Sequence, residues 1–336
     1  MRVALDVRVL ADPALAERGI GRYTSELAAA LAAEGLDVAE LRDLRRPWAP
    51  ARVAEGWDHV LLGRDARRAG AQLLHSPSID GATIRPGLPS VVTLHDLTPL
   101  KHSERYLRTG LKHRLRYAAV KRATRVIVPA HAVAEEAERL LGVTCVDVVP
   151  YAPSGAFRPV AAPRGLLARL RLPERFLLWV GGLDPPDPRK GIELLARHAA
   201  TADAPPLVLA GRHDAASARL AVDGRVVLAG RVEDDELAAL YSAADALVLP
   251  SEDEGFGLTP QEALACGTPV AAYAVPALAE SLGANPAVRL VTPGDLDALL
   301  AAARELAGTE AAAPVRTWAD VARDTIAVYQ RALQNA

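Results

Sequence analysis

Short runs of β-branched and aliphatic residues recur along the chain, and an alanine-rich stretch with helical spacing follows each run. The runs in the first half are Val3–Val7, His59–Leu62, Gln72–His75, Ser90–His95, Arg125–Val128 and Cys145–Val149. The runs in the second half are Phe176–Val180, Leu207–Ala210, Val226–Ala229, Ala246–Leu249, Pro269–Ala272 and Val288–Val291. Strands that alternate with helices indicate parallel sheets with right-handed crossovers. The pattern therefore predicts an α/β protein built on parallel sheets.

The segment Val149–Gly165 separates the two sets of runs, because it is rich in Pro and Gly and lacks periodicity. Such a segment is typical of a linker between domains. At 336 residues, the chain is also longer than one ordinary core requires. We predict two doubly wound domains, over residues 1–157 and 158–316, and a separate C-terminal segment over residues 317–336.

The C-terminal segment has the spacing of an amphipathic helix. Its apolar stripe consists of Trp318, Val321, Ala322, Ile326 and Tyr329. A break in the pattern precedes it, so we expect this helix to leave the second domain and pack elsewhere.

Composition narrows the classes of function. The formal net charge is −2, so no global field recruits nucleic acid. The two cysteines, Cys145 and Cys266, lie far apart in apolar settings and predict neither a disulfide framework nor a zinc site. The first residues lack the features of a signal peptide, and no charge-free apolar run reaches the length of about 20 residues that spans a bilayer. We expect a cytoplasmic protein without a nucleic-acid partner.

Glu254 and Glu262 stand either side of the loop GFGL (255–258), which follows a predicted strand. In open parallel sheets, ligands bind beyond the carboxyl ends of the strands, and glycines let a ligand approach the backbone. Thr259 as N-cap and Pro260 at the first helical position predict a helix here, whose N-terminus favours an anion. The alternative is structural, with Glu262 closing a capping box and Glu254 in a solvated acidic loop.

Arg189 and Lys190 follow another predicted strand end, at Gly181-Gly182. Two fixed cations at the carboxyl end of a strand suit a diphosphate. The alternative is a pair of surface bases, but cations at a helix start oppose the helix dipole. We therefore favour a binding role, above all for Lys190.

The first half offers weaker candidates. Gly19 and Gly21 match part of the dinucleotide-binding pattern G-x-G-x-x-G, but Thr24 replaces its third glycine, so NAD binding is disfavoured while contact with a phosphate stays open. His95 and Asp96 follow a predicted strand, where the imidazole could contact a sugar hydroxyl or transfer a proton. A structural role for His95 is the alternative.

The segment EGFGLTPQEALACGTPV (254–270) resembles the signature of retaining GT-B glycosyltransferases of the group-1 type, which include many bacterial mannosyl- and glucosyltransferases. GIGRYTSEL, VVTLHDLTPL, VVPYAPSGAFRP, PRKGIELL, LVLAGR and LAGRVEDDELAALYSAADALVLPS occur in the order of that family, and GIGRY and HDLTPL are similar to its mannosyltransferase-like subgroup. The resemblance implies the GT-B architecture, with two doubly wound Rossmann-like domains facing across a cleft. The second domain would bind the nucleotide sugar, and the last helix would cross back onto the first, acceptor-side domain.

The resemblance also implies a role for each matched position. Glu262 would hold the ribose hydroxyls and Glu254 the hydroxyls of the transferred sugar, while backbone N–H groups of the glycine loop would contact the sugar and diphosphate. Lys190 would neutralise the diphosphate, and His95 would lie near the anomeric carbon. The donor-binding positions are Gly19, Gly21, Gly182, Arg189, Lys190, Glu254, Phe256, Gly257, Leu258 and Glu262, and the catalytic positions are Glu254, His95 and Lys190.

Gly182 departs from the pattern of the family, because many members carry an arginine there that adds a second cation at the diphosphate. Arg189 can replace this missing cation only if its side chain turns inward, toward the diphosphate. This departure keeps open a weakly active or inactive nucleotide-sugar-binding protein. A sugar-nucleotide epimerase is a further alternative, which the spacing of the two glutamates disfavours.

The implied reaction moves a hexose, mannose or glucose, from a nucleotide-diphosphate sugar to a hydroxyl of a saccharide or lipid-linked acceptor. GDP-mannose is the first expectation for the donor, with UDP- or ADP-hexose as alternatives. We expect no cofactor and no metal ion, because no D-x-D pair stands at a strand end and Lys190 with a helix N-terminus can replace the metal.

The segment Lys101–Arg125 is strongly basic, with tyrosines and leucines interleaved. On an amphipathic helix, it could contact anionic headgroups or a lipid-diphosphate acceptor, and the protein would then be peripheral at the inner face of the membrane. A solvated helix whose apolar side packs on the core is the alternative.

Overall fold

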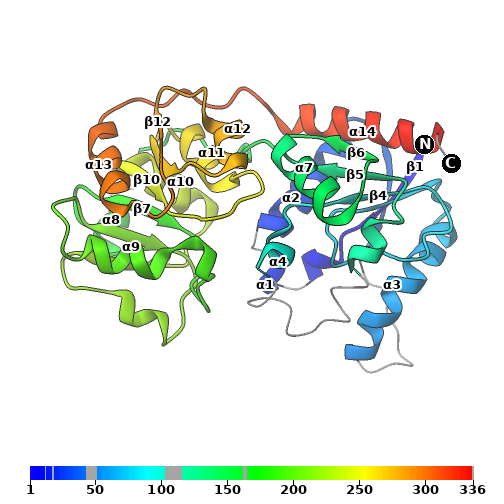
Figure 1. Cartoon of the computed structure of the whole chain (residues 1–336), viewed down its shortest axis with the longest axis horizontal. Helices are drawn as coiled ribbons and strands as arrows, with labels where there is room; N and C mark the ends of the chain where they lie inside the picture. The colour runs from blue at the N-terminus through cyan, green and yellow to red at the C-terminus, as the bar shows by residue number, and fades with distance from the viewer. Residues whose placement is uncertain (12, 17–18, 43–50, 103–115, 162–164, 335–336) are drawn as a thin grey trace. The chain divides into compact units, whose positions relative to one another are not determined.

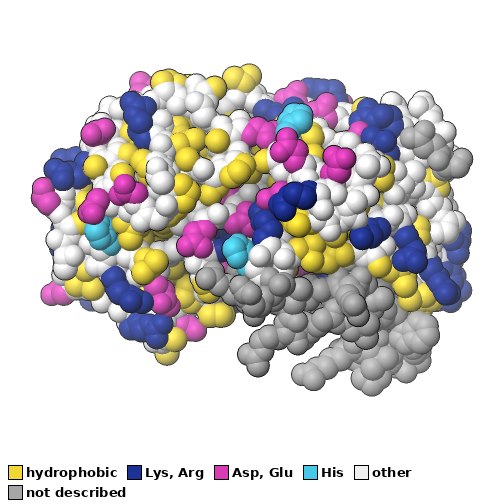
Figure 2. Space-filling view, viewed as in Figure 1, with side chains coloured by type: hydrophobic (Ala, Val, Ile, Leu, Met, Phe, Trp, Pro, Cys, Tyr) yellow, Lys and Arg dark blue, Asp and Glu magenta, His cyan; other side chains and the backbone are white. Residues whose placement is uncertain are grey.

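The structure is a computed structural model that describes residues 1–11, 13–16, 19–42, 51–102, 116–161 and 165–334. The chain divides into two compact units (Figure 1). Unit 1 consists of Met1–Tyr151 and Arg316–Ala336, and unit 2 of Ala152–Val315. Side chains of both charges are interspersed over the face shown in Figure 2, in keeping with the small net charge.

Unit 1 is built on a parallel sheet with the strand order β2-β1-β3-β4-β5-β6. Its strands are β1 (Arg2–Asp6), β2 (Asp37–Leu41), β3 (Leu73–Ser76), β4 (Ser90–Thr93), β5 (Arg125–Val128) and β6 (Val146–Val148). Its labelled helices are α1 (Pro13–Ala16), α2 (Gly19–Ala33), α3 (Ala51–Arg68), α4 (Thr98–Lys101), α7 (His131–Leu141) and α14 (Trp318–Gln334), with the 3-10 turn η1 (Arg8–Ala11). Strands β3 and β4 are buried throughout, as expected of a sheet covered on both faces.

Two predictions for unit 1 are wrong. The run His59–Leu62 lies within α3 instead of forming a strand, because four apolar residues in a row fit either structure and the buried Leu62 and Ala66 are spaced by one helical turn. Strand β2 was missed because Asp37–Leu41 has polar residues at both faces, as befits an edge strand that pairs with β1 alone.

Unit 2 is built on a second parallel sheet, with the order β12-β11-β10-β7-β8-β9. Its strands are β7 (Leu177–Val180), β8 (Leu207–Ala210), β9 (Val226–Gly230), β10 (Ala246–Leu249), β11 (Val270–Tyr273) and β12 (Val288–Val291). Its helices are α8 (Leu166–Arg169), α9 (Ile192–Ala199), α10 (Asp234–Ala243), α11 (Leu258–Ala265), α12 (Pro276–Leu282) and α13 (Leu296–Leu306), with the 3-10 turns η2 (Pro188–Lys190) and η3 (Ser217–Leu220). Two doubly wound parallel sheets confirm the predicted fold class.

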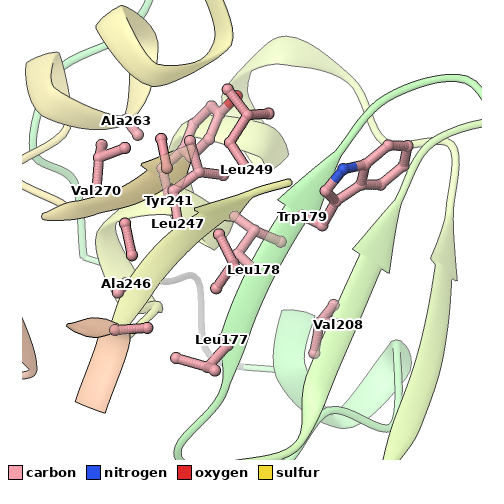
Figure 3. Packing of buried hydrophobic residues seen from close by; sticks show 14 of the residues in the cluster. Leu177, Leu178, Trp179, Val208, Tyr241, Ala246, Leu247, Leu249, Ala263 and Val270 are labelled. Carbon is pink, nitrogen blue, oxygen red and sulfur yellow. The ribbon is translucent and has the colours of Figure 1, made fainter. Parts of the chain in front are cut away.

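The core of unit 2 packs helices onto the central strands β7 and β10 (Figure 3). Leu178 of β7, its partner Leu247 of β10, and Tyr241 of α10 are fully buried in one hydrophobic cluster. A rigid pair of central strands fixes the positions of the loops that leave their carboxyl ends. These loops carry Lys190 and Glu254.

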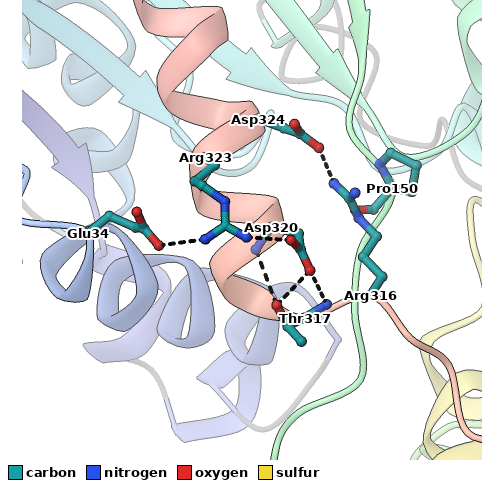
Figure 4. Close-up of polar contacts among 7 residues, drawn as sticks. All are labelled: Glu34, Pro150, Arg316, Thr317, Asp320, Arg323 and Asp324. Atoms are coloured by element: carbon teal, nitrogen blue, oxygen red, sulfur yellow. Dashed lines mark hydrogen bonds and ion pairs between the residues drawn. The ribbon is translucent and has the colours of Figure 1, made fainter.

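The last helix, α14, belongs to unit 1 and packs against α2. Its start is fixed by polar contacts (Figure 4): Arg316 Nε donates to the carbonyl oxygen of Pro150 at 2.7 Å, and Arg323 Nη1 lies 3.1 Å from Glu34 Oε1. Deeper in the unit, the Tyr329 hydroxyl lies 2.7 Å from His75 Nδ1, and both side chains are fully buried. Burial lowers the pKa of His75 to about 3, so this imidazole is neutral in the folded protein.

We expect the Tyr329→Phe variant to lose about 1–3 kcal/mol of stability, because the buried Nδ1 of His75 is left without a partner. The control is Arg323→Ala on the same helix, which removes an ion pair whose Arg323 side chain is 55% exposed and should change stability by less than about 1 kcal/mol. Urea unfolding of the two variants measures both effects. Equal losses in the two variants would contradict the buried hydrogen bond as the main anchor of α14.

Candidate functional site

Lys190 and Glu254 lie together at the carboxyl edge of the unit 2 sheet. Lys190 ends η2, in the segment that follows β7, and Glu254 lies in the loop between β10 and α11. Lys190 Nζ is 2.5 Å from Glu254 Oε1, and the two side chains are 27% and 11% exposed. The fold thus pairs two predicted site residues that are 64 positions apart in the sequence.

The backbones of these two loops are also joined. The Glu252 N–H donates to the carbonyl oxygen of Arg189 at 2.9 Å. Gly191 follows Lys190 at φ +60°, and a Cβ atom there would lie 2.6 Å from the carbonyl oxygen of Pro250. Glycine is therefore required where the two loops touch, and the ion pair stands on a fixed backbone.

Arg189 is paired with Asp187 in this structure. Its Nε donates to Asp187 Oδ2 at 2.7 Å, and its N–H donates to Asp187 Oδ1 at 3.1 Å, so Asp187 caps η2 and holds the guanidinium beside its own turn. Gly182 is exposed, and the nearest atom to a Cβ built there is Asp184 Oδ1 at 4.0 Å. Gly182 therefore has room for a Cβ atom.

Helix α11 begins two residues earlier than its capping pattern predicts. Its N-cap is Gly257, at φ +86°, and not Thr259, which lies inside the helix. The left-handed backbone at Gly257 ends the loop, and a Cβ there would lie 2.5 Å from Leu278 Cδ2. Among the residues that the structure describes, no acceptor is found for the N–H groups of Gly257, Leu258 and Thr259. These donors at a helix N-terminus are suited to an anion.

The neighbouring helix α12 holds the glycine loop in place. Ser281 Oγ donates to the carbonyl oxygen of Phe256 at 2.8 Å, and Gln261 Nε2 donates to the carbonyl oxygen of Ser281 at 3.1 Å. Phe256 itself is buried. The N–H groups of the loop are thus preorganised rather than free to turn away.

Glu262 is buried on α11, where it accepts a hydrogen bond from the Tyr241 hydroxyl at 3.2 Å. The structural alternative, a capping box closed by Glu262, is wrong, because a helix that begins after Gly257 places Glu262 beyond its first turn. Burial, and secondly the charge of Glu262, raise the pKa of the Cys266 thiol to about 12. Glu262 is therefore a buried carboxylate with a tyrosine partner.

The glycines of unit 1 differ from each other. Gly21 is buried in α2, and a Cβ there would lie 2.2 Å from the carbonyl oxygen of Ala16, so the close approach of α1 explains this glycine by itself. Gly19 is exposed at the start of α2, with no atom within 4 Å of a built Cβ. Of the two, Gly19 alone is open to a ligand.

His95 has a partner on each ring nitrogen. Nε2 lies 2.7 Å from the carbonyl oxygen of Pro77, and Nδ1 lies 2.8 Å from the Tyr151 hydroxyl. Burial lowers the pKa of His95 below its ordinary value of 6.5, although Pro77, Asp96 and Asp80 each act to raise it. The imidazole in this arrangement is neutral and has no unoccupied nitrogen for proton transfer.

Three side chains that contact the candidate residues were not found from the sequence. Tyr241 and Tyr151 are spaced by more than 20 residues from Glu262 and His95, so no local pattern points to them. Asp187 precedes Pro188 and Arg189, and this aspartate at a helix start was an available signal for a cap.

The basic segment Lys101–Arg125 is described only at its ends, because residues 103–115 lie outside the described part of the chain. At these ends, Lys101, Arg116 and Arg125 form ion pairs with Glu136, Asp80 and Asp147, each with N–O distances of 2.7 Å. Within the described ranges, no helix has the length and hydropathy needed to cross a bilayer, and no group of three His, Cys, Asp or Glu side chains is placed to hold a metal ion.

We expect Gly257→Ala to destabilise the protein by more than about 1 kcal/mol, because Gly257 has φ +86° and its Cβ would overlap Leu278. The control is Gly182→Ala, which should leave stability unchanged because the added Cβ has no atom closer than 4.0 Å. Urea unfolding compares the two. Equal midpoints would show that the backbone of the glycine loop is not held in the conformation described.

Two family models match the chain, and together they cover most of it. Residues 174–309 match a model described as "Glycosyl transferases group 1", and residues 18–152 match "Glycosyltransferase Family 4". The two matched segments fall in unit 2 and unit 1 respectively, apart from residue 152.

Curated relatives and a solved structure agree with the family models. A 2-deoxystreptamine N-acetyl-D-glucosaminyltransferase of Streptomyces fradiae is 32% identical over 319 residues, which are 87% of this chain and 72% of that protein. An MMP α-(1→4)-mannosyltransferase of Mycolicibacterium hassiacum is 39% identical over 129 residues, but these are only 34% of this chain and 31% of that protein. A sucrose-phosphate synthase from Thermosynechococcus elongatus shares the fold with a TM-score of 0.74 at 23% identity, over 100% of both chains. The chain therefore belongs to the group 1 glycosyltransferases.

Proposed function

We propose that the protein is a retaining hexosyltransferase, which moves mannose or glucose from a nucleotide-diphosphate sugar to a hydroxyl of a saccharide or lipid-linked acceptor. The observation that carries this proposal is the Lys190–Glu254 ion pair beside the N-terminus of α11. The Lys190 cation and the backbone N–H donors at the start of α11 can bind a diphosphate, while the Glu254 carboxylate next to them can accept hydrogen bonds from sugar hydroxyls. Membership of the group 1 family supports the same class of donor.

The roles that we propose for unit 2 are those that the resemblance implies, and its geometry is compatible with them. Lys190 and the N–H groups of Gly257 and Leu258 bind the diphosphate, and Phe256 completes the loop through its backbone. Glu254 binds hydroxyls of the transferred sugar. Glu262 binds the ribose hydroxyls, with Tyr241 holding its carboxylate in place. We assign the donor to unit 2 and the acceptor to unit 1, where Gly19 and His95 lie.

The chemistry breaks the bond between the anomeric carbon and the diphosphate, whose oxygen takes the electron pair. The sugar becomes oxocarbenium-like, and the acceptor oxygen attacks the same face and passes its proton to the departing diphosphate oxygen. Positive charge fixed near the diphosphate lowers the barrier, because negative charge develops there in the transition state. Lys190 and the start of α11 supply that charge, so we propose that transfer requires no divalent metal ion.

The donor and acceptor are proposed by class. GDP-mannose is the first candidate, supported by the partial likeness to a mannosyltransferase, with UDP- and ADP-hexoses as alternatives. The relative that matches most of the chain is named for N-acetylglucosaminyl transfer, so nucleotide sugars of N-acetylglucosamine belong in the same donor screen. We also propose a cytoplasmic location, with transient membrane contact through Lys101–Arg125 if the acceptor is lipid-linked.

An inactive or weakly active sugar-nucleotide-binding protein is the second candidate. The observation that favours it is the pairing of Arg189 with Asp187, because Arg189 then does not compensate for the missing arginine at Gly182. Lys190 is left as the cation beside Glu254. Release of free nucleoside diphosphate only in the presence of an acceptor distinguishes the transferase from this binding protein.

We expect Lys190→Ala to lower kcat by on the order of 100-fold or more, because the leaving diphosphate loses its cation. Nucleoside diphosphate released per unit time under saturating donor measures the effect. The control is Arg197→Ala on α9, which should retain full activity, because the Arg197 side chain is 72% exposed and pairs with nearby Glu193. Turnover of Lys190→Ala at the level of this control would overturn the proposed role.

We expect Gly182→Arg to bind the nucleoside diphosphate more tightly by roughly 10- to 100-fold, since a charge-assisted contact contributes about 1.5–3 kcal/mol. A Cβ built at Gly182 has Asp184 Oδ1 as its nearest atom, at 4.0 Å, so a side chain can leave the backbone there. Isothermal titration with GDP, UDP and ADP measures the gain, and Gly182→Gln provides a long side chain without the charge. Equal affinities for the arginine and glutamine variants would place the diphosphate away from Gly182.

A further inference from the structure

Tyr151 is the last residue of unit 1, and its hydroxyl bonds to the ring of His95. The hydrogen positions follow from the partners of the ring. The carbonyl oxygen of Pro77 can only accept, so His95 Nε2 carries a hydrogen and donates it. In the neutral imidazole, Nδ1 then has a lone pair, and the Tyr151 hydroxyl must be the donor to it.

An aromatic cluster holds this pair in place. The Tyr23 ring from α2 meets the His95 ring edge to face, at 4.9 Å between ring centroids, and lies against the Tyr151 ring at 4.6 Å. The Trp318 ring at the start of α14 packs on Tyr23 at 5.7 Å. The Tyr23 hydroxyl is in turn 3.2 Å from Thr93 Oγ1, at the end of β4. Tyr151 and His95 therefore have little freedom to separate while the cluster is intact.

The same cluster lies where the chain passes between its units. The chain leaves unit 1 after Tyr151 and returns to it at Arg316. Arg316 Nε donates to the carbonyl oxygen of Pro150, and Trp318 follows two residues later (Figure 4). The segment by which the chain leaves unit 1 and the segment by which it returns are thus hydrogen-bonded to each other. Tyr151, whose hydroxyl contacts His95, directly follows Pro150 in this bonded pair.

We propose that Tyr151 is a positioning residue for His95. Its hydroxyl donates to Nδ1 and so keeps the imidazole in its neutral Nε2–H form. Because Tyr151 is the last residue of unit 1, this hydrogen bond also connects the His95 ring to the backbone at the point where the chain leaves the unit. The catalytic consequence rests on the proposed function. If His95 lies near the anomeric carbon, a protonated ring would oppose the positive charge that develops on the sugar. Tyr151 prevents this by occupying the nitrogen that would take the proton.

The groups that face His95 allow us to predict in which direction its pKa changes when the Tyr151 hydroxyl is removed. Burial disfavours the protonated ring, while the Pro77 carbonyl, Asp96 and Asp80 favour it. Tyr151 and Tyr23 contribute no charge, since burial raises the pKa of each phenol well above its ordinary value. Removal of the Tyr151 hydroxyl exposes the Nδ1 lone pair in the presence of two carboxylates, so the pKa of His95 rises.

The test is Tyr151→Phe, in which the ring stays in the cluster and only the hydroxyl is lost. Nitrogen-15 NMR of the histidine rings follows the protonation of His95 between about pH 5 and 8, without any substrate. We expect the wild-type ring to be neutral with its hydrogen on Nε2 at pH 7, and the variant to take up its proton at a pH higher by about one unit or more. The acid limb of kcat/KM moves to higher pH by the same amount, because the neutral ring is the active form.

Tyr329→Phe is the matched control, since it removes the hydroxyl from the other buried tyrosine–histidine pair of unit 1 and leaves the Tyr151–His95 bond intact. A general loosening of unit 1 would move the His95 titration in both variants, and a positioning role moves it in Tyr151→Phe alone. An unchanged titration in folded Tyr151→Phe would overturn the proposal.

If Tyr151→Phe does not fold, the NMR spectrum of the wild-type protein still tests the proposal. A wild-type His95 ring that carries a hydrogen on Nδ1 at pH 7 would overturn it. If no nucleotide sugar is turned over, the proposed function fails, whereas the NMR titration still decides the role of Tyr151.

Discussion

The ion pair between Lys190 and Glu254 is the contact on which the account of unit 2 depends. It joins the segment after β7 to the segment after β10, and the Glu252–Arg189 backbone bond and the contact of Gly191 with Pro250 fix the same two loops. A charged pair that is mostly withdrawn from water requires its partners, because a lone buried charge is strongly disfavoured. In the proposed reaction, the diphosphate replaces the carboxylate as the partner of Lys190, and Glu254 then becomes available to the hydroxyls of the sugar. We therefore propose that this pair, which joins the two loops, also supplies two of the groups that bind the donor.

The two units use different means to hold their polar groups. In unit 2, glycines allow backbone to approach backbone, and the resulting loop presents N–H donors from Gly257 and Leu258 at a fixed place. In unit 1, tyrosine hydroxyls hold histidines, with Tyr151 on His95 and Tyr329 on His75. Since burial keeps both imidazoles neutral, unit 1 places dipoles rather than charges beside its sheet. A neutral imidazole at His95 suits the proposed reaction, because it adds no positive charge to oppose an oxocarbenium-like transition state.

The sequence was a good guide to the fold and to residues in local patterns. Buried parallel strands are continuous apolar runs, so eleven of the twelve predicted runs overlap strands of the structure, while His59–Leu62 was lost to the ambiguity of a short run. The loop with Glu254 and the turn with Lys190 were found because glycine, proline and charge cluster at strand ends. Their mutual contact was not found, since it depends on the adjacency of β7 and β10, which are separated in sequence by two other strands. Tyr151 and Tyr241 were missed for the same reason, because a tyrosine gives no local sign of its distant partner. The start of α11 was misplaced because Thr259-Pro260 is a common helix start and the sequence does not show that Gly257 takes a left-handed conformation.

The most direct test of the account is thermal unfolding of the protein with GDP, UDP and ADP, in parallel with Glu262→Gln. A nucleoside diphosphate present at 100 times its Kd stabilises the folded state by roughly 2.7 kcal/mol. The account predicts a rise in Tm with at least one nucleotide, and a smaller rise in Glu262→Gln, because the ribose hydroxyls lose a charged acceptor. No rise with any of the three nucleotides, or an equal rise in the variant, would contradict a donor site at the carboxyl edge of the unit 2 sheet.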